Sequence, residues 1–320
     1  MLISPEATRK LIDEGKLLHI AGNEDLLKQL PKGNWIGGST EYFMAKEGGR
    51  VSGDELFVTV FPYESFNICS YDAKEIPQIA ADAFDSGFTI TIVPFDSQVH
   101  IEYAQNAAGY DRMFMKHVVG WIAGVNLSKP GQTPIAVNGK TGETFDNKAV
   151  ALHLQVPDDK TVSVNIINIF EQDPASPLIE FTEEGFSVSA CLIDGVETNL
   201  ADYVVKNKID TKLPLVGDYS GNGVNVSYKS MENGVVNLYA PVFTGVKYRV
   251  AKNLSNYEAS FHEHLAKHKD TEAVFSCNCI LNFLYGELEG KKMTAFDGAI
   301  TFGEIAYQLV NQTLVYVTVS

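Results

Sequence analysis

The sequence has 320 residues, of which 45% are hydrophobic and 20% are charged, an ordinary balance for a globular protein. Its 25 Lys+Arg residues and 40 Asp+Glu residues give a formal net charge of −15. Such a surface repels the phosphates of nucleic acids and of anionic membranes, and no cluster of basic residues interrupts it. The composition therefore argues against nucleic-acid and membrane partners.

Length and the N-terminal stretch set further expectations. A single hydrophobic core rarely grows beyond about 250–300 residues, so the length predicts two domains. The opening "MLISPEATRKLIDEGK" lacks the basic and apolar regions of a signal peptide, and no window reaches the roughly 18–20 apolar residues of a membrane span. We therefore expect a cytoplasmic protein. Its cysteines, which should stay reduced there, are Cys69, Cys191, Cys277 and Cys279.

Hydrophobic periodicity in the first half predicts strands alternating with helices. Ser4, Pro5 and Glu6 are typical of a helix start, because a hydroxyl caps the helix, proline fits its first turn and an acid faces the positive end of the dipole. A short helix is expected after Asn23, and "GNWIGGSTEYFM" then predicts a strand that runs into a Gly-Gly-Ser-Thr loop. The remaining predicted elements are strands over 55–62, 66–72, 88–95, 118–125, 148–156 and 162–170 and helices over 76–87 and 98–115.

The stretch "EQDPASP" interrupts every hydrophobic period, and it predicts a domain boundary near Asp173. We therefore expect a mixed α/β protein with two lobes, residues 1–173 and 174–320, each a mixed β-sheet with flanking helices. The elements predicted after the boundary are a hairpin over 179–195, a helix over 198–208, a β-meander over 217–242, a helix over 254–269 and strands over 273–279 and 312–319. Between these two strands stands the closing segment "GAITFGEI", with a turn over 301–304.

Two cysteines stand one residue apart in the stretch "EAVFSCNCILNF". In a strand, Cys277 and Cys279 would share a face about 6.5–7 Å apart, which is too far for an easy disulfide. Zinc sites usually have two or more residues between paired cysteines. Three interpretations remain: small buried hydrophobic residues, thiols that line a ligand pocket or react, and, least of all, metal ligands.

The stretch "HEHLAKH" has a spacing that metal sites use. On a helix, His264 and His268 lie one turn apart and could hold a metal ion together. The metalloprotease signature has Glu directly after the first His, where this chain has Leu265. We therefore favour a solvated helix face and expect no metal site, with His264 and His268 as weak candidates. Ser39 lacks the G-x-S-x-G context of a nucleophile elbow, and no catalytic residue is expected elsewhere.

Five fragments carry a resemblance to a known family: "WIGGSTEYF", "FTEEGFSVSACLIDGVETNLADYV", "FTGVKYRVAKN", "FSCNC" and the closing "DGAITFGEI…NQTLVYVTV". Taken in order, they resemble the FIST family, the sensory domains of bacterial signalling proteins that also occur in some F-box proteins. The likeness spans most of the chain, and the closing segment is its most specific part. The chain departs from the family pattern after Cys277, where relatives carry a small residue and then Gly-Arg and this chain has Asn278 and Cys279. It also has "EYFM" after Thr40, where relatives carry a Gly-Glu pair.

The resemblance implies a sensory protein that binds a small, amino-acid-like molecule and has no catalytic activity of its own. It implies a pocket at strand ends, where Ser39 and Thr40 would bind a carboxylate and Glu304 an ammonium group. A separate signalling protein would be its partner. The residues of this implied ligand site are Gly37, Gly38, Ser39, Thr40, Ser276, Cys277, Thr301, Gly303 and Glu304.

Three alternatives stay open beside this interpretation, which expects no cofactor. A haem-binding gas sensor of the same family would use a histidine of "HEHLAKH" or His117 as its axial ligand. A cysteine-dependent enzyme would need a lowered pKa at the Cys277 thiol and a base within hydrogen-bond reach. A purely structural or interaction protein would need no pocket.

Overall fold

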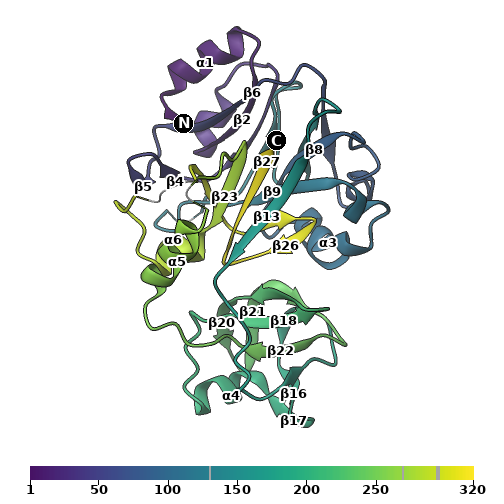
Figure 1. Cartoon of the computed structure of the whole chain (residues 1–320), viewed down its shortest axis with the longest axis vertical. Helices are drawn as coiled ribbons and strands as arrows, with labels where there is room; N and C mark the ends of the chain where they lie inside the picture. Colours follow the sequence, from purple (N-terminus) through teal and green to yellow (C-terminus); the bar gives the residue numbers. More distant parts are fainter. Residues whose placement is uncertain (130, 269, 293–295) are drawn as a thin grey trace.

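The computed structural model describes residues 1–129, 131–268, 270–292 and 296–320. It confirms a mixed α/β fold in which residues in strands outnumber those in helices. Figure 1 shows a larger lobe, built from both ends of the chain, above a smaller lobe, drawn in green, that is built from its middle.

The first sheet of the larger lobe has helices at two of its strand connections. Helix α1 (Pro5–Asp13) follows the predicted start, because the Ser4 side chain accepts a hydrogen bond from the Ala7 amide. Asn23 caps helix α2 (Glu24–Lys28) in the same way. The strands, in sheet order, are β1 (Leu2–Ile3), β6 (Leu56–Phe61), β2 (Leu17–Gly22), β3 (Trp35–Ser39), β10 (Ala136–Asn138) and β11 (Glu143–Phe145).

The second sheet contains a parallel pair of strands joined by a helix. Helix α3 (Gln98–Asn106) connects β8 to β9, a crossover that a parallel pair requires. The strands, in sheet order, are β26 (Gln308–Val310), β25 (Glu304–Ala306), β9 (His117–Ala123), β8 (Gly87–Pro94), β12 (Ala149–Gln155) and β7 (Phe66–Tyr71).

The third sheet joins the C-terminal strands to strands of the first half. Strand β27 pairs with β13, and β24 pairs with β4, so hydrogen-bonded ladders cross the boundary expected near Asp173. Helix α6 (Ile280–Tyr285) follows β23 directly, and α5 (Tyr257–Ala266) precedes it. The strands, in sheet order, are β13 (Val162–Asn168), β27 (Thr313–Val319), β23 (Phe275–Cys279), β24 (Gly298–Thr301), β4 (Tyr42–Ala45) and β5 (Gly48–Val51).

The smaller lobe holds two sheets and helix α4 (Leu200–Lys206), which lies in the predicted range 198–208. One sheet consists of β17 (Val196–Asn199), β16 (Ala190–Ile193), β14 (Ile179–Glu180), β22 (Lys247–Val250), β18 (Leu215–Tyr219) and β19 (Asn222–Val226). The other consists of β15 (Gly185–Val188), β21 (Val235–Val242) and β20 (Tyr228–Glu232). The hairpin predicted over 179–195 is divided between them, because β14 pairs with β16 and β15 pairs with β21.

A continuous contact surface joins the two lobes. One hydrophobic cluster contains Ile122 and Leu309 of the larger lobe and Leu238 of the smaller lobe. Beside it, the Asn225 amide donates to the Asn311 carbonyl oxygen over 3.0 Å in a buried polar contact. The lobes are therefore packed against each other through both apolar and polar groups.

Several predicted helices are shorter or absent in the structure. The range 76–87 holds only a 3₁₀ turn at Ile76–Gln78, because the chain buries Ile76 and Ile79 and then turns so that Asp82 accepts a hydrogen bond from the Tyr71 hydroxyl. Helix α5 ends at Ala266, and the last residue of its predicted range, 269, lies outside the described residues. The longest helix of the described ranges has 10 residues, and none is long and apolar enough to cross a membrane.

Candidate functional site

The structure brings several of the sequence-predicted ligand residues together. Strands β23 and β24 run in parallel, with Cys277 opposite Ala299 and Cys279 opposite Thr301. The Thr40 hydroxyl donates to the Ile300 carbonyl oxygen over 2.7 Å, which places the Gly-Gly-Ser-Thr segment beside β24. The three segments that the sequence pointed to therefore meet at one place in the larger lobe.

This meeting point is a closed polar cluster inside the core. Glu304 has 0% exposure, and the Thr313 hydroxyl donates to its Oε2 over 2.8 Å. The Thr301 hydroxyl oxygen lies 3.0 Å from its Oε1. Burial raises the pKa of Glu304 to about 8, so the group holds its proton at neutral pH. A neutral, enclosed carboxyl group does not suit the expected role of Glu304 as the partner of an ammonium group.

The Gly-Gly-Ser part of the predicted loop lies inside strand β3 instead. Ser39 uses its hydroxyl within the protein, donating to the Gly124 carbonyl oxygen over 2.8 Å and accepting from the Ile135 amide over 2.9 Å. A Cβ atom at Gly38 would stand 2.7 Å from the ring of Trp121, so close packing explains this glycine. Ser39 and Thr40 line a cavity of about 10 Å³, which is the size of one water molecule.

The two neighbouring thiols lie in the predicted strand and are both buried, with 1% exposure each. Cys277 donates to the Gly120 carbonyl oxygen over 3.3 Å. Burial raises the pKa of both Cys277 and Cys279 well above the usual thiol range, and the nearby Glu304 carboxyl adds to the shift. Both thiols therefore stay protonated at neutral pH, which is the opposite of what a cysteine nucleophile requires.

The candidate histidines make ordinary hydrogen bonds. His264 Nδ1 donates to the Ser260 carbonyl oxygen over 2.8 Å on the helix, whereas His268 lies beyond the end of α5, 3.1 Å from the Tyr316 hydroxyl. The expected spacing of one helical turn is therefore lost. Within the described residues, no group of three or more Cys, His, Asp or Glu side chains could hold a metal ion.

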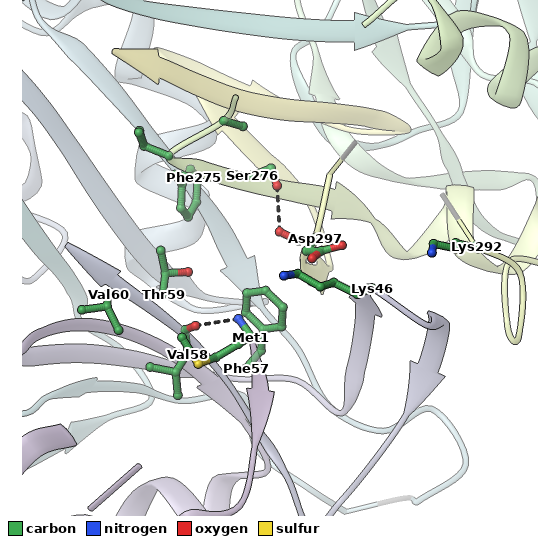
Figure 2. Close-up of a pocket in the computed structure, with 12 residues that line it drawn as sticks. Met1, Lys46, Phe57, Val58, Thr59, Val60, Phe275, Ser276, Lys292 and Asp297 are labelled. Atoms are coloured by element: carbon green, nitrogen blue, oxygen red, sulfur yellow. Dashed lines mark hydrogen bonds between the residues drawn. The ribbon is translucent and has the colours of Figure 1, made fainter. Parts of the chain in front are cut away.

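An open cavity of about 520 Å³ lies between strands β6 and β23, and Ser276 is the predicted ligand residue that lines it (Figure 2). The cavity exists because β1 pairs only with the first part of β6, opposite Leu56 and Phe57. Beyond Val58, the edge of β6 at Thr59 has no neighbouring strand on this side among the described residues, and it faces the start of β23. We call this space, which Lys46 and Asp297 also line, the Lys46–Asp297 cavity.

The Lys46–Asp297 cavity combines opposite charges with aromatic walls. Figure 2 shows Lys46 and Asp297 at one end, with Lys292 farther out and Phe275 at the other end. Burial raises the pKa of Asp297 above its usual range, although the nearby ammonium groups, including those of Lys46 and Lys292, oppose the shift. Two lysines against one aspartate make the side chains of this lining net positive, in a chain whose formal charge is −15. The Ser276 hydroxyl donates to the Asp297 carbonyl oxygen over 2.9 Å.

A buried histidine behind this lining was not identified as a site residue from the sequence. His19 pairs with Thr59 across strands β2 and β6, and its ring centroid lies 5.3 Å from that of Phe275. Its Nε2 accepts a hydrogen bond from Trp121 over 2.8 Å, while its Nδ1 has no partner among the described residues. Burial lowers the pKa of His19 to about 3, so the ring is neutral. The one available signal was a histidine inside the apolar strand sequence "LLHIAG".

The chain belongs to a family of unknown function, DUF6976, whose family model matches residues 3–320. No curated protein and no solved structure matches the chain.

Proposed function

We propose that this chain is a cytoplasmic sensory protein that binds a small, amino-acid-like ligand in the Lys46–Asp297 cavity, transmits the signal to a separate protein and has no catalytic activity of its own. The observation that carries the proposal is the meeting of a half-buried carboxylate, two lysines and two phenylalanine side chains in one cavity of about 520 Å³. Ligand pockets commonly have volumes of roughly 300–1,000 Å³ and a few convergent polar groups among apolar walls. The resemblance of the sequence to the FIST family supports the same class of function.

The charges of the cavity favour a particular kind of amino acid. Asp297 would bind the α-ammonium group, while Lys46 and Lys292 would bind carboxylates through charge-assisted hydrogen bonds. The net positive lining matches a ligand with one more carboxylate than ammonium group. A dicarboxylic amino acid such as glutamate or aspartate therefore fits better than alanine.

The position of the cavity suggests how binding would be transmitted. The strand edge at Thr59 belongs to the first sheet, whereas Ser276 belongs to the third sheet and Asp297 directly precedes its strand β24. Lys46 lies in the turn between β4 and β5, also in the third sheet. A ligand that touches both sheets favours the arrangement in which they lie close together, and this shift in population is the signal.

Thermal-shift and calorimetric titrations test the proposal with glutamate, aspartate, alanine and succinate as probes. At a hundred times its dissociation constant, a ligand adds about 2.7 kcal/mol to stability. We expect Asp297→Asn to abolish glutamate binding and to retain succinate binding, because succinate has no ammonium group. Lys46→Gln should weaken both ligands, and Lys10→Gln on the exposed face of α1 is the matched control.

Two outcomes would contradict this function. The first is the lack of a saturable response to every amino acid, and the second is a response that both cavity variants leave unchanged. An absorption spectrum of the purified protein tests the haem alternative. A Soret band would show bound haem, and haem would then be the sensing group in place of an amino acid.

A further inference from the structure

A second cavity, of about 390 Å³, lies where the two lobes meet. Phe95 and His100 line it from the larger lobe, at the end of β8 and the start of α3. Phe186 and Lys229 line it from strands β15 and β20 of the smaller lobe. The carboxyl end of a parallel strand that leads into a helix is a preferred ligand position in α/β proteins, and so is the junction of two lobes.

His100 supplies an unused hydrogen-bond donor to this junction. The residue is 3% exposed, and its ring lies between Phe95 and Phe186, at centroid distances of 5.4 and 5.6 Å. Its Nδ1 accepts a hydrogen bond from the Asp96 amide over 3.3 Å, so the proton of the neutral ring is on Nε2. That Nε2–H has no partner among the described residues. A buried unpaired donor is costly, and a ligand that accepts from it removes the cost.

Two further donors face the same space from the smaller lobe. The Lys229 ammonium lies 4.9 Å from the centre of the Phe95 ring and, within the described ranges, forms no ion pair. The Ser187 hydroxyl donates to Asn237 over 2.7 Å, and the Asn237 amide donates in turn to the Ser230 hydroxyl over 3.0 Å. The Ser230 hydroxyl therefore has its own proton left to donate. Three residues that line the cavity, His100, Lys229 and Ser230, thus each carry a proton that is free to be donated.

The hydrogen bonds and charges around this cavity favour a carboxylate ligand over a phosphate. Phosphate sites at helix starts use free backbone amides. Here the Ser97 hydroxyl accepts from the His100 amide over 3.2 Å, and the Asn147 side chain accepts from the Gln98 amide over 2.9 Å. The Asp96 carboxylate also lines the cavity and would repel a second negative charge. A single negative charge on a flat body suits the one lysine and the two phenylalanine rings.

We propose that the cavity between α3 and the smaller lobe is a second ligand site, which binds a small aromatic monocarboxylate. The carboxylate accepts from Lys229 and from His100 Nε2, and the ring packs against Phe95 and Phe186. Because these partners belong to both lobes, the bound ligand links the lobes and stabilises their contact. The site shares no residue with the Lys46–Asp297 cavity and does not depend on the function proposed there.

Calorimetric titration of the full chain tests this site with four probes: benzoate, cyclohexanecarboxylate, benzyl alcohol and phenyl phosphate. We expect saturable benzoate binding at one site, weaker binding of the non-planar carboxylate and of phenyl phosphate, and no binding of the alcohol. Lys229→Met keeps the apolar stem and should weaken benzoate about tenfold or more, the effect of one charge-assisted hydrogen bond. Lys247→Met, an exposed lysine of the same lobe, is the matched control.

A second variant and a cross-check keep the test decisive. His100→Phe removes the Nε2 donor and should also weaken benzoate about tenfold, with circular dichroism to verify folding. Asp297→Asn should leave benzoate affinity unchanged, which separates the two sites. The proposal is overturned if wild-type protein shows no saturable benzoate binding, if Lys229→Met binds benzoate as wild type does, or if phenyl phosphate binds more tightly than benzoate.

Discussion

Replacing Glu304 by glutamine should remove a large pH dependence from the stability of this protein. Glu304 is fully buried, and its pKa rises to about 8 in the folded chain, against about 4.3 for an exposed glutamate. The folded state therefore binds more protons than the unfolded state between these two values. Stability falls as pH rises through that window and is constant again above the folded pKa.

The magnitude follows from the size of the shift. Each pKa unit corresponds to about 1.4 kcal/mol, so this group alone should lower the free energy of unfolding by roughly 3 kcal/mol between pH 5 and pH 8. Glutamine preserves the hydrogen bonds of the neutral acid: its oxygen can accept from Thr313, as Oε2 does, and its amide can donate toward Thr301. The variant should thus match wild type near pH 5 and exceed it in stability at pH 8.

Urea unfolding of both proteins at pH 5, 6, 7 and 8, with a reductant present, measures the difference. Glu14→Gln, at the exposed end of α1, controls for the loss of one carboxylate. A constant difference between wild type and Glu304→Gln at all four pH values would show that Glu304 titrates alike in both states. That result would refute the account of a neutral carboxyl group in the closed polar cluster.

Two further predictions concern buried groups. In native protein, an alkylating reagent near neutral pH should modify half-buried Cys69 first and leave Cys277 and Cys279 intact. Burial raises the pKa of all three thiols, but it raises those of the enclosed Cys277 and Cys279 well above the usual thiol range; mass spectrometry reads the sites, and rapid labelling of Cys277 would contradict this. At Glu41, burial alone would raise the pKa, but hydrogen bonds from Asn126 and Lys129, among others, lower it overall. Glu41→Gln should therefore cost about 2 kcal/mol at pH 7, and urea unfolding should show that cost shrinking as pH falls through the folded pKa; an equal cost at pH 3 would argue against it.

The strands of this fold were largely predictable from the sequence, whereas the closed polar cluster around Glu304 and the two open cavities were not. Strands β8 and β27 carry runs of β-branched and aromatic residues, which favour a strand in any setting. Glu304 gave no such signal, since a glutamate after Gly303 is typical of a turn. Its burial depends on the long-range pairing of β25 with β9 and on contact with Thr313, which follows nine residues later in the chain.

The two cavities show the same limit more sharply. Ser276 entered the predicted site through the family resemblance, but nothing in the sequence marked Lys46 or Asp297 as a ligand residue, and sheet pairing brings them together. At the junction of the lobes, the hydrogen bond from the Asp96 amide to His100 is local in sequence, whereas Lys229 arrives from the other lobe. Periodicity describes which face of an element is apolar, but not which distant polar groups meet across it.

The return of the C-terminal strands to the first half has a consequence for the order of folding. Within the described chain, β13 has β27 as its sheet neighbour, with Asn168 opposite Thr313. During synthesis, β13 therefore remains without its partner until β27 has been made, while the smaller lobe between them is already complete in sequence. Such late pairing across a long stretch slows folding and leaves an apolar strand open to wrong partners. A nascent chain of this kind should need protection from aggregation until β27 has been made.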